Sequence, residues 1–182
     1  MKTYIALLKG INVGGHRKIP MADLRSVLTN ASLHNVSTYI QTGNVFFQSS
    51  EKSKAALEHL IHTEIKQHFG FEVDVVIINH NDIQRIVNDC PFPNHIKENS
   101  YFMILHNAPT EAQIKIASEK IYEGEDYKII NDCIYYYCPK GMGQSKFNMN
   151  YFERKLNTFA TARNYNTMLK LKTISLEIEQ QH

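Results

Sequence analysis

The sequence has few of the features that mark secreted or membrane proteins. It contains only three cysteines, too few for the disulfide framework of a small secreted domain, and the odd number leaves at least one thiol unpaired. No apolar run reaches the roughly 18 residues that a transmembrane helix needs. The first residues also lack the long apolar region and small-residue cleavage site of a signal peptide. These absences predict a soluble, cytoplasmic protein that does not bind a membrane.

The chain also lacks the patterns of common catalytic and metal sites. Cys133 and Cys138 are five positions apart in one expected strand, so their side chains face opposite sides of the sheet and cannot chelate or pair locally. Cys90 has His95 nearby but no third ligand at metal spacing, and no Gly-x-Ser-x-Gly elbow occurs. We therefore expect no metal site and no cofactor. A Cys90 nucleophile with His80 or His95 as its base remains a minor alternative.

The composition itself is that of a folded protein. Of the 182 residues, 43% are apolar and 21% are charged, and both values are close to globular averages, which excludes wholesale disorder. A chain of this length buries roughly 70% of its unfolded surface on folding, so it needs no disulfide or metal crosslinks for stability. The length fits one domain or two small halves that share a core.

The formal net charge of +2 conceals a strong segregation of charge. Residues 1–18 contain four basic side chains and no acidic one, and residues 140–172 contain seven basic side chains against the single Glu153. The remaining residues are net acidic. The two basic segments either converge on an anionic partner or lie on separate solvated faces.

Residues 1–80 are predicted to form a first half. The order is strand, helix, strand, strand, helix, strand, with the strands over 3–8, 36–40, 44–48 and 73–78 and the helices over 21–33 and 52–69. Gly43 marks a tight hairpin between the second and third strands. This order is the split βαβ pattern of ferredoxin-like folds.

Residues 100–182 are predicted to repeat much of this pattern and to add C-terminal helices. The expected elements are a strand over 100–106, a helix opened by the capping box at Thr110 and running to about Tyr122, a hairpin of 127–130 and 133–138, and helices over about 147–157 and 165–179. Residues 81–99 contain a short helix near 82–88 and then two prolines, and they join the halves. The sequence therefore predicts an α+β protein of duplicated ferredoxin-like halves.

The first candidate ligand-binding loop follows the first strand, over residues 9–18. Its three glycines permit positive φ angles and close backbone approach, so several N–H groups can point at one anion. The spacing matches neither a P-loop nor a dinucleotide fingerprint, and a plain glycine-rich connection is the alternative. The residues assigned to ligand binding here are Lys9, Asn12, Gly14, Gly15, Arg17 and Lys18.

Two further loops offer polar or basic groups. The hairpin tip over 39–45 contributes Gln41 and Asn44, and its alternative interpretation is ordinary turn chemistry. The loop over 138–146 contributes Lys140 and Lys146 just before an expected helix, whose N-terminus favours anions. An ordinary strand-to-helix connection is the alternative there.

The fourth candidate loop spans residues 160–167, before the last helix. Arg163 suits a bidentate contact with phosphate or carboxylate, and Tyr165 suits stacking on a base or sugar. Asn164 or Thr161 is expected to cap the helix, with Arg163 in an internal salt bridge as the alternative. Asn164 is included among the candidate ligand residues.

Four strings in these segments resemble one family. They are YIALLKGINVGG at 4–15, TYIQTGNV at 38–45, SK at 145–146 and TARNYNT at 161–167. Together they resemble a bacterial family catalogued as domain of unknown function 1697, over nearly the whole chain. Tyr165 stands where the family usually has tryptophan, and Thr42 where serine is common. The resemblance implies two ferredoxin-like halves and supplies no activity.

The leading hypothesis is a protein that binds a phosphate-bearing ligand, either a nucleotide or single-stranded nucleic acid, with basic side chains on the phosphates. The first alternative is a small metabolic enzyme with a cleft between its halves, lined by Gln41, Asn44 and Arg163, in which His16 is the acid/base group at neutral pH. The second alternative is an interaction module without a small ligand. Whether the protein is an enzyme, and its oligomeric state, stay open at this point.

Overall fold

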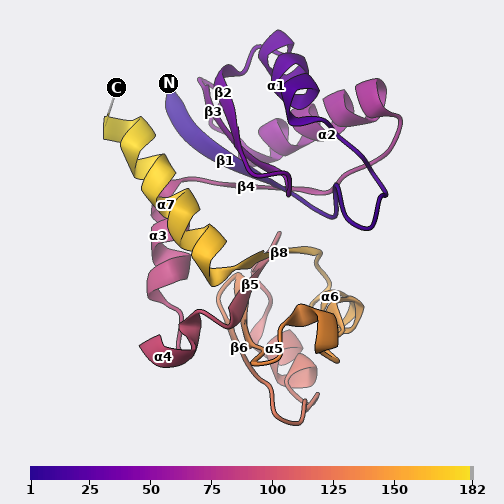
Figure 1. The fold of residues 1–182 in the computed structure, drawn as a ribbon, viewed down its shortest axis with the longest axis vertical. Coiled ribbons are helices and arrows are strands. Elements are labelled where there is room, and N and C mark those ends of the chain that lie inside the picture. Colours follow the sequence, from indigo (N-terminus) through magenta and orange to yellow (C-terminus); the bar gives the residue numbers. More distant parts are fainter. Residues whose placement is uncertain (181–182) are drawn as a thin grey trace. The chain divides into compact units, whose positions relative to one another are not determined.

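The chain folds into two compact units. One contains Met1–Gln84 together with the segment that begins at Lys170, and the other contains Arg85–Leu169. The computed structural model describes residues 1–180 (Figure 1). Each unit has its own four-stranded antiparallel sheet.

The first unit has the ferredoxin-like order of elements. They are β1 (Lys2–Leu8), α1 (Met21–Asn30), β2 (His34–Tyr39), β3 (Asn44–Ser49), α2 (Lys54–Phe69) and β4 (Val75–Ile78). The sheet order is β2-β3-β1-β4, and α1 and α2 lie on one side of it (Figure 1). Alternate residues of β1, such as Tyr4, Ala6 and Leu8, join the core with Leu24 and Leu57, because side chains alternate across a strand.

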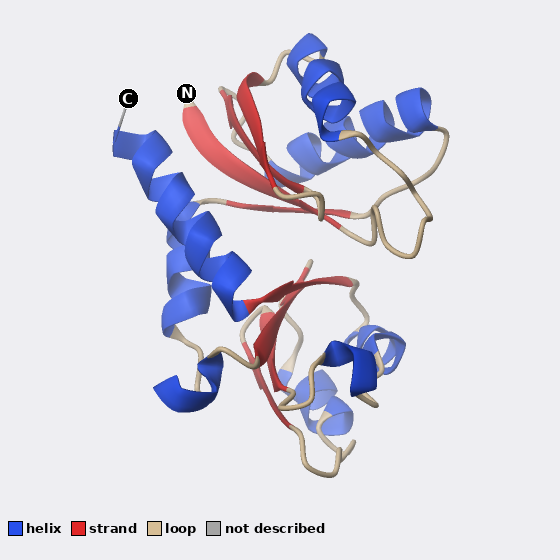
Figure 2. Ribbon diagram, in the orientation of Figure 1, coloured by secondary structure: helices blue, strands red, loops and turns tan. Residues whose placement is uncertain are grey.

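The second unit repeats the same topology. Its elements are β5 (Ser100–Leu105), α5 (Glu111–Ala117), β6 (Asp126–Ile130), β7 (Cys133–Tyr137), α6 (Met149–Leu156) and β8 (Ala160–Asn164). The sheet order is β6-β7-β5-β8, and Figure 2 shows the strands and helices of both units. Its core is rich in aromatic residues, since Tyr122, Tyr136 and Phe152 are buried together. The duplicated ferredoxin-like fold predicted from the sequence is confirmed.

Strand β8 corrects the sequence analysis, which assigned residues 160–164 to a polar loop. The segment pairs antiparallel with β5, from Tyr101 opposite Asn164 to Leu105 opposite Ala160. Its composition gave little apolar signal because two of its three buried positions hold Thr161 and Arg163. Tertiary pairing therefore overrides local propensity here, and it supplies the fourth strand of the second sheet.

Two helices end earlier than predicted. α5 stops at Ala117 instead of Tyr122, where the hydroxyl of Tyr127 donates to the carbonyls of Ala117 and Lys120 at 3.2 and 2.6 Å. A side chain from β6 thus satisfies carbonyls that a longer helix would have used. α1 stops at Asn30 instead of residue 33, because Ser32 takes the left-handed conformation with φ of 66°.

The remaining helices are α3 (His80–Asn88), α4 (Asn94–Lys97), the 3-10 turn η1 (Met142–Gln144) and α7 (Tyr165–Gln180). Within the first unit, Nδ1 of His80 lies 2.9 Å from Oγ of Ser175, and both side chains are buried. The Ser175 hydroxyl donates in turn to the Lys172 carbonyl at 2.9 Å. Within residues 1–180, no helix is both long and apolar enough to cross a membrane.

The three cysteines are all buried and unpaired. Burial is the main cause that raises the thiol pKa of Cys90, Cys133 and Cys138. Cys138 belongs to the aromatic core of the second unit. None of these thiols is therefore poised as a thiolate nucleophile at neutral pH.

Candidate functional site

Asn12 organises the loop that follows β1. Its side-chain nitrogen donates to the carbonyls of Ile19 and Gln41 at 3.0 and 2.8 Å, and its side-chain oxygen accepts from the Ile19 N–H at 2.9 Å. Its backbone N–H donates to the Arg17 carbonyl at 3.2 Å. The residue has φ of 54°, a conformation that asparagine tolerates better than most residues. Asn12 therefore closes the loop and ties it to the β2–β3 hairpin.

The middle of the loop forms an exposed glycine turn. Val13 and His16 form an isolated antiparallel bridge, with the His16 N–H donating to the Val13 carbonyl at 3.0 Å. Gly14 and Gly15 between them have φ of 58° and 78°. A Cβ placed on Gly15 would meet nothing within 4 Å. The turn thus leaves open space in which an anion can approach the backbone.

A shallow hollow of about 500 Å³ lies beside Asn12 and Lys18, which flank this turn in the sequence. It is lined by Asn12, Lys18, Ile19, Pro20, Met21, Ala22 and Gln41. α1 begins here, and Pro20 at its N-cap provides no side-chain cap. The first-turn N–H groups of a helix have no partner within the helix, and they favour negative charge. The hollow therefore combines a lysine ammonium with the positive end of a helix.

The other two predicted residues of the first unit lie at strand ends. Asn44 is fully buried at the start of β3, and its side-chain nitrogen donates to the Tyr39 carbonyl and the Thr42 hydroxyl, both at 3.1 Å. Lys9 lies at the end of β1 in a 3.7 Å ion pair with Asp74. Both side chains have clear structural roles, and a direct ligand contact stays a prediction for each.

Arg163 is a buried arginine on β8. One guanidinium nitrogen donates to the Thr161 hydroxyl at 2.9 Å and to the Ala162 carbonyl at 2.7 Å. Burial lowers the pKa of the guanidinium to about 10, because a low-dielectric surrounding disfavours the charged form. At neutral pH the side chain still carries its charge, and this charge is held in a fixed place beside Thr161.

The next two residues begin α7. The side-chain oxygen of Asn164 accepts from the Thr167 N–H at 2.7 Å, so Asn164 provides the helix cap predicted for it or for Thr161. Tyr165 is half-buried, and its ring centroid lies 5.9 Å from that of Phe102. The ring thus has an aromatic neighbour within the second unit.

Lys140 and Lys146 are exposed on the loop that leads from β7 to α6. A polar cluster anchors this loop, and the sequence analysis did not identify it. The Tyr136 hydroxyl donates to Glu125 and lies 2.5 Å from the Ser145 hydroxyl. The Cys138 thiol donates to the same carboxylate at 3.6 Å. Burial and Glu125 raise the pKa of Tyr136. Only the Ser145-Lys146 motif could have drawn attention to the cluster.

The candidate residues thus fall into two groups, one in each unit. In the first unit, Asn12, Lys18 and Gln41 line one hollow, and Gly14, Gly15 and Arg17 lie in the segment between Asn12 and Lys18. In the second unit, the group is Lys140, Lys146, Arg163, Asn164 and Tyr165. Ligand contacts by either group remain predictions.

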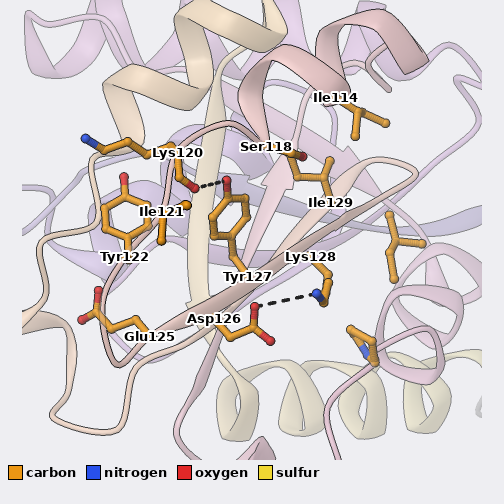
Figure 3. A pocket seen from close by; sticks show the side chains of 12 residues that line it. Ile114, Ser118, Lys120, Ile121, Tyr122, Glu125, Asp126, Tyr127, Lys128 and Ile129 are labelled. Atoms are coloured by element: carbon orange, nitrogen blue, oxygen red, sulfur yellow. Dashed lines mark hydrogen bonds and ion pairs between the residues drawn. The ribbon is translucent and has the colours of Figure 1, made fainter.

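A second hollow, of about 470 Å³, lies beside β6 in the second unit and contains none of the candidate residues (Figure 3). Its lining includes Ile114, Ile121 and Ile129 as well as charged residues such as Lys120 and Lys128. It therefore represents a separate surface of the second unit.

The comparisons with known proteins agree with the sequence resemblance. The model of a family described as "Protein of unknown function (DUF1697)" matches residues 1–135. The chain belongs to this family. The strings at 145–146 and 161–167 lie outside the matched residues.

A solved structure is similar to this family member over almost its full length. It is the conserved bacterial protein SP0830 from Streptococcus pneumoniae, with a TM-score of 0.74 and 25% sequence identity. The alignment covers 95% of this chain and 98% of that one. No curated protein matches the chain. The comparisons thus establish family and fold, and the function has to be argued from the residues.

Proposed function

We propose that the first unit binds a phosphate-bearing ligand in the hollow beside Asn12 and Lys18. The observation that supports this most is the meeting of Lys18, Asn12 and the start of α1 around one open volume of about 500 Å³, with the glycine turn in the segment between Asn12 and Lys18. Backbone N–H groups, a cation and a helix N-terminus are the groups that bind phosphate in proteins.

Each residue has a distinct role in this proposal. Lys18 and Arg17 supply the positive charge, and both are exposed. The backbone of Gly14 and Gly15 approaches the anion, because neither residue has a side chain to block it. Asn12 positions the loop, since both hydrogens of its amide are already donated to carbonyls.

The second unit has a candidate surface of its own for a nucleotide or a single-stranded nucleic acid. Lys140 and Lys146 neutralise phosphates as exposed cations. Tyr165 stacks on a base, with Phe102 as its aromatic neighbour. Arg163 and Asn164 hold this end of β8 in place, as judged from their own hydrogen bonds.

Thermal unfolding in the presence of nucleotides, phosphosugars and short oligonucleotides tests the proposal. A ligand at about 100 times its dissociation constant adds roughly 2.7 kcal/mol, which corresponds to a rise of about 5–11 °C in a protein of this size. The rise should shrink in Lys18→Ala and persist in the matched control Lys52→Ala, because Lys52 is exposed away from the hollow.

The salt dependence separates the two ligand classes. A shift with oligonucleotides that falls steeply with salt indicates nucleic acid, because counterion release dominates such binding. A shift with one small phosphate compound indicates a nucleotide or metabolite. No shift with any phosphate compound, or an equal shift in Lys18→Ala and Lys52→Ala, would overturn the proposal.

A further inference from the structure

Strand β6 is an edge strand of the second sheet. The sheet order is β6-β7-β5-β8, so within the part of the chain that the structure describes only β7 pairs with β6. An edge strand presents N–H and C=O groups that another strand can bind. The hollow of Figure 3 runs beside this edge.

The hydrogen-bond pattern fixes which residues of β6 point their backbone outward. The Leu105 N–H donates to the Asp132 carbonyl at 2.9 Å. Every second residue after Asp132, namely Ile134 and Tyr136, therefore forms its backbone hydrogen bonds with β5. The intervening residues of β7 bond to β6, because antiparallel partners alternate. Lys128 is opposite Tyr135 and bonds inward. The N–H and C=O groups of Tyr127 and Ile129 therefore face the free edge.

The side chains of β6 divide between two faces. Tyr127 and Ile129 pack towards the core of the second unit. Asp126 and Lys128 are exposed on the opposite face, with a 3.8 Å ion pair between them. An acidic and a basic residue two positions apart on one edge are self-complementary under a twofold axis. The charges of Asp126 and Lys128 therefore complement those of a second copy of the same strand.

The parity of the ladder limits how two copies of β6 can pair. In an antiparallel pair, two residues directly opposite each other either both point their N–H and C=O groups at the partner strand or both point them away. Outward and inward residues alternate along β6, so opposite residues in the two copies differ by an even number of positions. The twofold axis therefore passes through a residue and not between two residues. An axis at Lys128 would place the Lys128 ammonium groups of the two copies opposite each other. An axis at Asp126 would place the two Asp126 carboxylates opposite each other. An axis at Tyr127 places Asp126 opposite Lys128 of the second copy, twice.

We infer that β6 is a homodimerisation edge, on which a second copy of this chain pairs antiparallel about Tyr127. In this register the N–H and C=O groups of Tyr127 bond to those of Tyr127 in the second copy. The two Asp126–Lys128 pairs lie at non-hydrogen-bonded positions, where side chains approach most closely. The two sheets thereby join edge to edge.

An exposed apolar residue beside the edge supports a protein partner. Ile121 is 86% exposed, and it lines the same hollow as Ile114 and Ile129. Figure 3 shows these side chains around the strand that bears Asp126 and Lys128. A second copy seated on β6 gives this apolar side chain a surface to pack against, and water alone does not.

Charge reversal and its repair test this dimer. Sedimentation equilibrium over a concentration series up to about 1 mM would detect even a weak association. Lys128→Asp and Asp126→Lys should each weaken the dimer about tenfold or more, because each variant places like charges opposite each other twice. The double variant Asp126→Lys/Lys128→Asp exchanges the charges and should restore wild-type association. The control Lys52→Asp introduces the same change of charge in the first unit and should leave the association unaltered.

Amide exchange gives a second readout. The N–H groups of Tyr127 and Ile129 should become slower to exchange as the protein concentration rises, while those of exposed loops should not. A protein that stays monomeric throughout the series would overturn the inference. So would a dimer that is equally strong in wild type and both single variants, or one that leaves these two amides unprotected. Thermal melts of each variant identify any that fail to fold, and Asp126 and Lys128 are exposed enough to be replaced safely.

Discussion

Asn12 and Ile19 are joined by two hydrogen bonds, one in each direction between the side-chain amide and the backbone. The amide nitrogen donates to the Ile19 carbonyl and the amide oxygen accepts from the Ile19 N–H. The side chain thus acts like a piece of neighbouring strand. It holds together the two ends of a segment that contains the exposed glycine turn, so the shape of the candidate phosphate site depends on this contact.

Replacing Asn12 should therefore destabilise the first unit. Asn12→Ala removes three hydrogen bonds, each worth about 1 kcal/mol net, and places alanine at φ of 54°. Asn12→Gly removes the same bonds but relieves the backbone, so it should cost less. Urea unfolding of the two variants measures the difference. Equal stability of Asn12→Ala and the wild type would show that the side-chain bonds are not formed in solution.

Gly43 should tolerate substitution much less well than Gly70. Both have positive φ, of 81° and 79°, so alanine at either position should cost about 1–2 kcal/mol from the backbone alone. A Cβ on Gly43 would lie 2.7 Å from the Cβ of Leu8, whereas one on Gly70 would meet nothing within 4 Å. Thermal melts of the two alanine variants should show the larger loss for Gly43→Ala. A similar loss in both would contradict the close approach to Leu8.

Ser175→Ala should destabilise the protein by about 1–3 kcal/mol, because it leaves the buried His80 nitrogen without this partner. Ser26→Ala is a matched control. Like Ser175, Ser26 lies in a helix and donates to a carbonyl of the preceding turn, here that of Ala22, but it is exposed. Its replacement should change the free energy of unfolding by less than about 0.5 kcal/mol. If the two variants melt together, the His80–Ser175 bond contributes nothing.

Stability should fall at alkaline pH. Burial is the main cause that raises the pKa of Tyr122, Tyr127, Tyr135 and Tyr136, in the case of Tyr127 to about 12. The unfolded chain loses these protons near pH 10 while the folded protein keeps them. Their contribution is therefore complete below pH 10 and is lost as the pH rises through the folded pKa. Absorbance at 295 nm should show a late-titrating class that disappears in denaturant. A single transition near pH 10 for all tyrosines would contradict the prediction.

The repeated half-fold could be predicted from the sequence because its signals are local. A nearly continuous apolar run marks β1, a β-rich run after Gly43 marks β3, helical spacing marks α2, and a capping box marks the start of α5. These patterns are set by the chain itself. The order of elements then leaves the ferredoxin-like topology as the natural arrangement.

The features that escaped prediction depend on distant residues. β8 is a strand because β5 pairs with it, although two of its three buried positions are occupied by Thr161 and Arg163. Glu125 belongs to a short acidic stretch, and only the fold brings it to Tyr136 and Cys138. Among the candidate ligand residues, the glycine turn and Lys18 stay predictions of the sequence. The sequence could not show that the side-chain amides of Asn12 and Asn44 donate hydrogen bonds to backbone carbonyls of the protein itself.

The burial of all three thiols has a practical consequence for work on this protein. Thiol reagents attack the thiolate, and these cysteines are both hidden and held in the neutral form. The folded wild-type chain should therefore stay unmodified by a maleimide under mild conditions. A single cysteine introduced at an exposed position such as Lys128 or Lys18 would then carry a fluorophore or spin label selectively. The native cysteines therefore do not have to be replaced before a single reactive cysteine is introduced for labelling.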